Sequence, residues 1–143
     1  MVLQTSVMTT ETKMLSGIIL LTVPSVIYGG YFLLQVLGGR QEKLDLTLFQ
    51  KAMFRAGHAH AGVLILFSLI ALLYVDETVV GEMWKWIIRV SIPLSAILIS
   101  GGFFGAAIGK QVTKPGKLIG LLYFGIISLV TGVITLGIGL ITG

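Results

Sequence analysis

The sequence predicts an all-α integral membrane protein, a single domain of four transmembrane helices packed as a bundle. Of its 143 residues, 55% are hydrophobic and only 11% are charged, whereas a soluble domain carries about 25% charged residues. The mean hydropathy is +1.00. The 19 glycines agree with this class, because glycine is frequent in membrane helices. Four apolar runs are long enough to cross a hydrocarbon core of about 30 Å. We expect spans at 14–38, 53–75, 83–108 and 118–142.

The first span follows a polar, Thr-rich segment, Met1 to Lys13, which we expect to be a short tail or a lead-in to the helix. Its apolar run is longer than the hydrophobic region of about 7–15 residues in a signal peptide, and no small-residue cleavage site follows. We therefore expect a retained transmembrane helix. Pro24 lies inside this run, which a membrane helix tolerates when a neighbouring helix covers the freed carbonyl group.

The second span belongs to a helix that is expected to begin before the membrane. Thr47 and Gln50 fit a capping box, in which each side chain bonds the other residue's backbone N–H at the start of a helix. Lys51 and Arg55 then lie near the lipid headgroups, where long basic side chains reach toward water.

The third span follows a short acidic connection, Asp76 to Glu82, and starts with Trp84 and Trp86. Tryptophan at this position is typical of the membrane interface. A basic turn leads to the fourth span, which carries no charge. Small residues allow close contact between membrane helices. The fourth span has glycines at positions 120, 125, 132, 137 and 139.

The distribution of Lys and Arg predicts the orientation in the membrane. The first and third loops, with the adjoining turn of the second helix, contain Arg40, Lys43, Lys51, Arg55, Lys110, Lys114 and Lys117. The opposite side contains only Lys13, Lys85 and Arg89. The positive-inside rule places the first and third loops in the cytoplasm, and we expect the inner (plasma) membrane of a bacterium. No nucleic-acid partner is expected, because the chain lacks a basic face with aromatic platforms.

The composition also restricts the chemistry. The chain has no cysteine, which excludes disulfides, thiolate nucleophiles, Cys-ligated zinc and iron–sulfur clusters. No Asp or Glu lies within the four expected spans. This absence disfavours carboxylate acid–base catalysis and ion-coupled transport.

The strongest candidate for a functional site is the stretch Phe54 to Gly62, which contains both histidines, His58 and His60. An imidazole inside a bilayer is costly unless it has a partner, so it marks a functional hypothesis. Small neighbours let a flat ligand or another helix approach the backbone. These neighbours include Gly57, Ala61 and Gly62. Arg55 precedes them, and its guanidinium suits a carboxylate such as a haem propionate.

Several roles for the two histidines remain open. They are two residues apart, so on a helix they point about 200° apart and cannot both bind one metal ion. A single axial haem ligand needs only one of them. The alternatives are a hydrogen bond to a Ser, Thr or carbonyl of another helix, and a proton relay.

A family resemblance favours the haem hypothesis. The four spans and the stretch Ala59-His60-Ala61-Gly62 resemble the styrene oxide isomerases and, more distantly, the hydroxylaminobenzene mutases. The run Ser100 to Phe104 is similar to a run in the third helix of the isomerases. The resemblance implies that His60 is the axial ligand of haem b, between subunits of a trimer. In that family the ferric iron acts as a Lewis acid on the epoxide oxygen.

Three positions depart from the family pattern. The catalytic tyrosine of the family falls at Phe104, its asparagine falls near Leu66, and its aspartate falls nearest to Ala96. The resemblance therefore carries over His60 as the ligand and does not carry over the reaction.

The resulting prediction is a homo-oligomeric, b-type haem protein of the lipid bilayer. His60 binds the iron, and the other residues at the cofactor are His58, Arg55, Gly57, Ala61 and Gly62. With an open sixth position, the iron would act as a Lewis acid in an isomerase-like reaction such as epoxide isomerisation, or bind a small apolar molecule. The alternatives are a cofactor-free accessory membrane subunit and a small membrane transporter.

Overall fold

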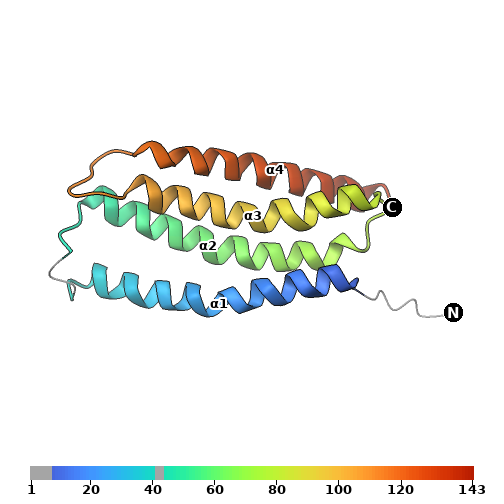
Figure 1. Ribbon diagram of the computed structural model, residues 1–143, viewed down its shortest axis with the longest axis horizontal. Helices are drawn as coiled ribbons and strands as arrows, with labels where there is room; N and C mark the ends of the chain where they lie inside the picture. The colour runs from blue at the N-terminus through green and yellow to red at the C-terminus, as the bar shows by residue number, and fades with distance from the viewer. Residues whose placement is uncertain (1–7, 41–43) are drawn as a thin grey trace.

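Four long helices make up most of the protein in a computed structural model that describes residues 8–40 and 44–143 (Figure 1). They are α1 (Thr10–Leu37), α2 (Leu48–Val75), α3 (Glu82–Ala106) and α4 (Gly120–Ile141), with a 3₁₀ turn at Lys117–Ile119 before α4. The described ranges contain no strand. All four helices are long and apolar enough to cross a membrane. The predicted all-α class is confirmed, and the four apolar helices support an integral membrane protein.

Two of the helices begin where threonine caps them. α1 begins at Thr10, four residues before the expected span, because the Thr9 hydroxyl accepts a hydrogen bond from the Thr12 N–H at 3.3 Å. At the start of α2 the predicted capping box is confirmed. The Thr47 hydroxyl accepts from the Gln50 N–H, and the Gln50 side-chain oxygen accepts from the Thr47 N–H, both at 3.1 Å. The caps therefore extend both helices beyond their most apolar segments.

The Gln50 side chain has a second role that joins distant parts of the chain. Its amide nitrogen donates hydrogen bonds to the carbonyl oxygens of Ala107 and Gly109, each at 3.0 Å. The Thr47 hydroxyl donates to the carbonyl of Val112. The start of α2 is therefore attached to the connection between α3 and α4.

The helices form an open row, in which α3 packs against α2 on one side and α4 on the other (Figure 1). α1 packs mainly against α2, touches α3 only slightly and does not contact α4. Buried residues from all four helices form the main core cluster, which contains Ile19, Ala71, Leu72, Val75, Ile88, Ile92 and Leu136. α1 is thus the helix with the least support from the others.

Glycines on α4 explain why that helix lies so close to α3. A Cβ atom added at Gly125 would lie 2.6 Å from Ile99 Cγ1 of α3, whereas one at Gly139 would lie 3.1 Å from Thr78 Cβ in the connection between α2 and α3. Gly132, midway between them in sequence, faces Ser91 and Ile92. The prediction of close helix contact is therefore confirmed for Gly125 and Gly132. Gly120 and Gly137 have open space around them in the single chain.

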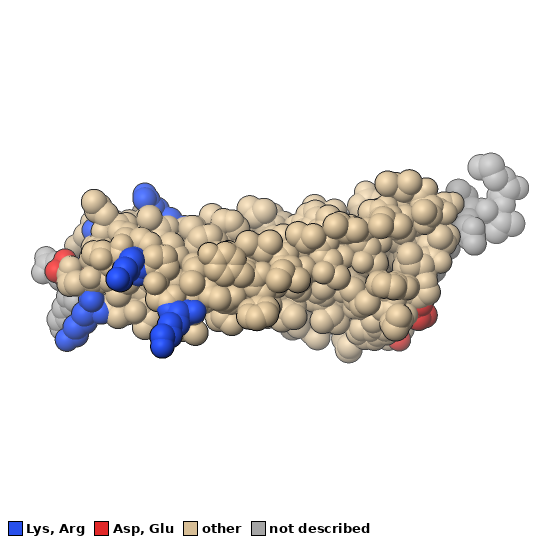
Figure 2. All heavy atoms as spheres, turned by 90° about the horizontal axis from the view of Figure 1, so that it is seen from above, with Lys and Arg blue, Asp and Glu red and all other residues tan. Residues whose placement is uncertain are grey.

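Charge is distributed unequally between the two ends of the row. Lys and Arg side chains gather at the end that holds the α1–α2 and α3–α4 connections (Figure 2). The described residues that supply this charge are Arg40, Lys51, Arg55, Lys110, Lys114 and Lys117. Lys43, which belongs to the same predicted group, lies outside the described residues. The two basic loops thus lie at the same end of the protein.

Candidate functional site

The stretch 54–62 is regular helix inside α2, so its side chains spread around the helix axis. His60 lies beside α3, where its ring centroid is 4.8 Å from that of Phe103. His58 lies beside α1, against Gly29 and Gly30. The two imidazoles therefore face different neighbours, as expected for residues two positions apart on a helix.

His60 has a fixed ring orientation and a free nitrogen. Its Nδ1 lies 2.8 Å from the carbonyl oxygen of Ala56, one turn earlier in α2. A carbonyl can only accept, so Nδ1 carries the proton and donates this hydrogen bond. Nε2 then keeps its lone pair. The residue is exposed on the surface of the row.

His58 occupies a close contact between α1 and α2. A Cβ atom at Gly30 would lie 2.9 Å from His58 Nε2, so any larger residue would displace the ring from this position. His58 also lines a pocket of about 410 Å³ with Val23, Ile27, Ala59, Gly62 and Leu66. Within the described residues, neither histidine bonds a serine or threonine, and His58 has no hydrogen-bond partner.

The remaining predicted site residues do not converge on one histidine. Arg55 is exposed, and Gly57 is buried. A Cβ at Gly57 would lie 3.0 Å from the Phe104 ring, so that ring takes the space expected for a cofactor beside Gly57. Ala61 lines a separate cavity with α1 and α3. Gly62 has open space beside it and lines the pocket of His58.

A cluster that sequence reasoning missed lies at the opposite end, around Arg89 of α3. Arg89 is 1% exposed, and all three guanidinium nitrogens are hydrogen-bonded. Its Nη2 lies 2.6 Å from Asp76, its Nη1 lies 3.3 Å from Glu82, and its Nε lies 3.0 Å from the Thr12 hydroxyl. Nη2 also lies 3.3 Å from the Thr9 hydroxyl. We call Thr9, Thr12, Asp76, Glu82 and Arg89 the Arg89 cluster.

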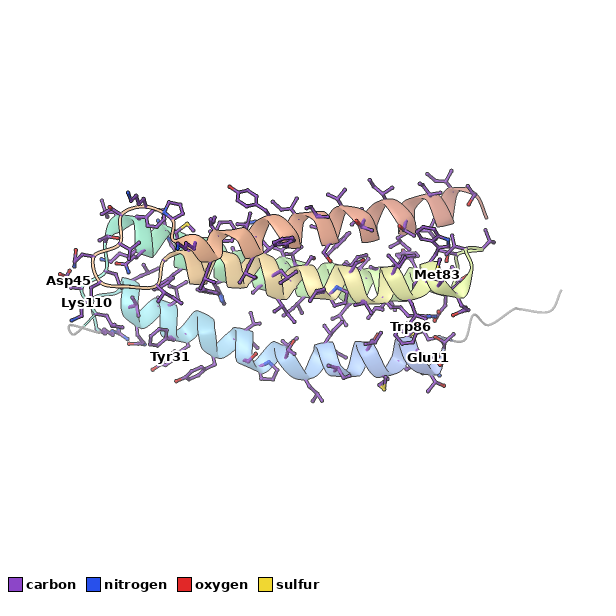
Figure 3. All side chains as sticks on the ribbon, turned by 45° about the horizontal axis from the view of Figure 1, so that its top comes forward. Glu11, Tyr31, Asp45, Met83, Trp86 and Lys110 are labelled. Carbon is purple, nitrogen blue, oxygen red and sulfur yellow. The ribbon has the colours of Figure 1, made fainter. Side chains whose placement is uncertain are left out.

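The Arg89 cluster attaches α1 to the ends of α2 and α3. The Thr9 N–H donates to Asp76 at 2.9 Å, and Arg89 lies 5.6 Å from the centre of the Trp86 ring. Figure 3 labels Glu11 and Trp86 at this end, whereas Asp45 and Lys110 lie at the other. An arginine seven residues into a membrane helix requires partners. The position of Arg89 inside a membrane helix was therefore the sequence signal for this cluster. In the sequence analysis, Arg89 was only counted among the basic residues on one side of the membrane.

Acid is expected to weaken the attachment of α1 only below pH 3.8. Desolvation raises the pKa of the Asp76 carboxyl, but hydrogen bonds from Thr9 and Arg89 outweigh it and hold the pKa below its ordinary 3.8. Ionised Asp76 therefore stabilises the fold above that pH, and the contribution is lost as the pH falls through the folded-state pKa. Trp86 fluorescence in a Trp84→Phe background would follow this loss. Asp76→Asn should remove the acid transition, and a transition starting well above pH 3.8 would assign it to another group.

The described residues contain no group of three or more His, Cys, Asp or Glu side chains that could hold a metal ion. A metal ion or a haem iron at the candidate site would therefore have a single imidazole of this chain as its ligand. Comparisons with protein-family models, curated proteins and solved structures found no match to this chain.

Proposed function

We propose that this protein is a membrane haem-binding protein in which Nε2 of His60 is the axial ligand of haem b. The observation that carries the proposal is the hydrogen bond from His60 Nδ1 to the carbonyl of Ala56. Metal-binding histidines usually donate the second ring N–H to a carbonyl or carboxylate, which fixes the tautomer and the ring. His60 already has this arrangement, and the residue is exposed on the surface of α2.

The exposed strip of α2 at His60 supports a flat ligand that is covered by a second copy of the chain. His60 and Val63, three residues later, are exposed, whereas Ala59, Gly62 and Leu66 line the neighbouring pocket of His58. A macrocycle on this strip would remain open to lipid on one face in a monomer. We therefore extend the proposal to a homo-oligomer with the haem between copies, a trimer by the resemblance.

Ferric haem with one protein ligand would supply a Lewis acid at its open coordination position. The chain offers little else for epoxide isomerisation. Phe104, at the position of the family's tyrosine, has no hydroxyl and packs against Phe54, with ring centroids 5.8 Å apart. Haem binding is accordingly the proposal, and isomerisation is a reaction to try once haem is found.

The sidedness proposal rests on charge. Because the two basic loops lie at one end, the positive-inside rule favours a cytoplasmic location for that end. The Arg89 cluster would then lie near the outer surface of a bacterial inner membrane.

Visible absorption of the purified protein tests the haem proposal. The wild type, expressed with added hemin and purified in mild detergent, should show a Soret band. We expect His60→Ala to lose the band and His58→Ala to keep it. The pair is matched, because both variants remove an imidazole from the same helix turn.

Other outcomes contradict the proposal in distinct ways. Loss of the band only in His58→Ala would mean that His58, on the α1 side of α2, is the haem ligand. No band in the wild type would end the haem proposal and favour a cofactor-free subunit. The contact of His58 with Gly29 and Gly30 supports that second function, because it is a close helix–helix packing contact. Solute flux in liposomes that depends on either histidine would favour a transporter.

A further inference from the structure

Positive charge gathers at the end of the protein where α2 begins and α3 connects to α4 (Figure 2). Lys51 is half-buried there, and the other basic side chains are exposed. All three ion pairs within the described residues involve Lys85 or Arg89, at the opposite end. We call the basic surface the set formed by Lys51 and Arg55 of α2 with Lys110, Lys114 and Lys117 between α3 and α4.

Asp45, the acidic residue that the structure describes at this end, does not neutralise the basic surface. Its carboxylate accepts a hydrogen bond from Gln111 Nε2 at 2.8 Å, and its backbone carbonyl accepts from the same nitrogen at 3.0 Å. The other acidic side chains of the described ranges lie toward the opposite end and are Glu11, Asp76, Glu77 and Glu82. Unbalanced positive charge therefore remains at this end, where it attracts anions.

Hydrogen bonds hold the two halves of the basic surface together. The buried amide of Gln50, the neighbour of Lys51, donates to the carbonyl of Gly109 at 3.0 Å. On the other side of Lys110, Gln111 is held by its two bonds to the start of α2 and has a backbone φ of 52°. In a residue other than glycine this conformation costs free energy and persists where surrounding contacts fix it. Lys110, between Gly109 and Gln111, is therefore fixed beside the start of α2.

The depth of Arg55 distinguishes a membrane partner from a soluble one. Arg55 lies seven residues beyond Leu48, the first residue of α2, which is about 10 Å along the helix axis. Ala52 and Ala59, about one turn before and after it, are exposed and apolar. A long basic side chain at this position reaches toward the headgroups, and a guanidinium can bind a phosphate through two parallel hydrogen bonds. A soluble partner would have to displace lipid to reach it.

We propose that the basic surface binds the phosphate groups of anionic phospholipids, and that Gln50 is the positioning residue that joins its two halves. Clusters of about four to eight Lys or Arg residues beside membrane helices suit anionic headgroups, and each cation contributes about fivefold to the affinity. Phosphatidylglycerol has a net negative headgroup and gains from these cations. Phosphatidylcholine carries its own ammonium group and gains much less. The proposal is independent of haem, because neither histidine belongs to the basic surface.

Native mass spectrometry of the full chain in detergent resolves individual bound lipids and gives a dissociation constant for each. The probes are phosphatidylglycerol and phosphatidylcholine with the same acyl chains. The wild type should prefer phosphatidylglycerol by about tenfold or more, and Arg55→Gln and Lys110→Gln should each reduce this preference by about fivefold. Lys13→Gln is the matched control. It also removes one positive charge from an exposed side chain, but at the opposite end, so the preference should not change.

Gln50→Leu tests the positioning role, because it changes no charge. Without the bonds to the carbonyls of Ala107 and Gly109, the connection should no longer be held against α2. We expect the preference for phosphatidylglycerol to fall by about as much as the loss of one cation, about fivefold. Binding of phosphatidylcholine as in the wild type would show that the variant is folded. Equal weakening of both lipids would be a general structural defect and would overturn the role of Gln50.

Four outcomes would overturn the lipid site. The first is no preference for phosphatidylglycerol in the wild type. The second is an equal fall of the preference in Lys13→Gln and Arg55→Gln, which would assign it to net charge. The third is displacement of phosphatidylglycerol by an equal concentration of soluble glycerol phosphate, which would assign the surface to a soluble phosphate compound. The fourth is displacement by an equal concentration of a polyglutamate peptide, which would assign it to an acidic protein.

Discussion

Arg89→Met is expected to lower the free energy of unfolding by about 3 kcal/mol, the scale for breaking a buried ion pair from one side. The substitution leaves Asp76, whose side chain is 10% exposed, without its closest charged partner. It also removes hydrogen bonds to Thr9 and Thr12 of the α1 end. Because α1 has few other contacts, we expect it to separate from α2 and α3 first. Thermal unfolding in detergent, followed by circular dichroism, measures the loss.

Lys85→Met is the matched control for this prediction. Lys85 lies on the same helix and pairs with Glu82 at 3.9 Å, but the Glu82 side chain is 71% exposed. The Lys85 side chain is 15% exposed, but a pair this long with a solvent-exposed partner contributes about 0–1 kcal/mol, so this variant should unfold almost like the wild type. Adding Asp76→Leu to Arg89→Met should recover part of the loss, because replacing both partners by apolar groups removes the unpaired charge. Equal stability of Arg89→Met and Lys85→Met would contradict the role of the Arg89 cluster.

Gly102→Ala is expected to destabilise the contact between α3 and α4 by about 1–3 kcal/mol, the usual cost of overpacking. A Cβ atom at Gly102 would lie 2.5 Å from Leu122 N and 2.8 Å from Leu122 Cα. These are backbone atoms, so no side-chain rotation relieves the clash and the two helices must move apart.

The neighbouring glycine provides the control for that effect. A Cβ atom added at Gly101 would have no atom within 4 Å, and alanine is a better helix former than glycine by about 1 kcal/mol. Gly101→Ala should therefore be neutral or stabilising. Chemical unfolding of both variants decides the matter, and similar midpoints would mean that α3 and α4 are not in backbone contact at Gly102.

Local patterns predicted the elements of this fold well. The four apolar runs predicted the four helices, and Thr47 with Gln50 predicted the start of α2. Both signals depend on residues that are close in sequence. The sequence left open whether the segment before Met14 is a tail or a lead-in to the helix, because Thr9 lies among several threonines and only its contacts with Thr12 and Asp76 identify it as the cap.

Contacts between distant residues were much harder to predict. Helix geometry correctly separated His58 from His60, but it did not indicate which helix each one faces. The ring of Phe104 fills the space beside Gly57, and that pairing depends on the register between α2 and α3. The partners of Arg89 come from three helix ends, so counting charges per side could not reveal them. Haem binding stays a prediction.

The Arg89 cluster also has a consequence for the order of assembly during synthesis. Thr9 is separated from Asp76 by 67 residues and from Arg89 by 80. At a translation rate of about 5–20 residues per second, about 4–16 s pass between the synthesis of Thr9 and that of Arg89. α1 is therefore synthesised well before α3, which supplies Arg89 as the partner of its polar end. Until then, the hydroxyls of Thr9 and Thr12 must be satisfied by water or by lipid headgroups.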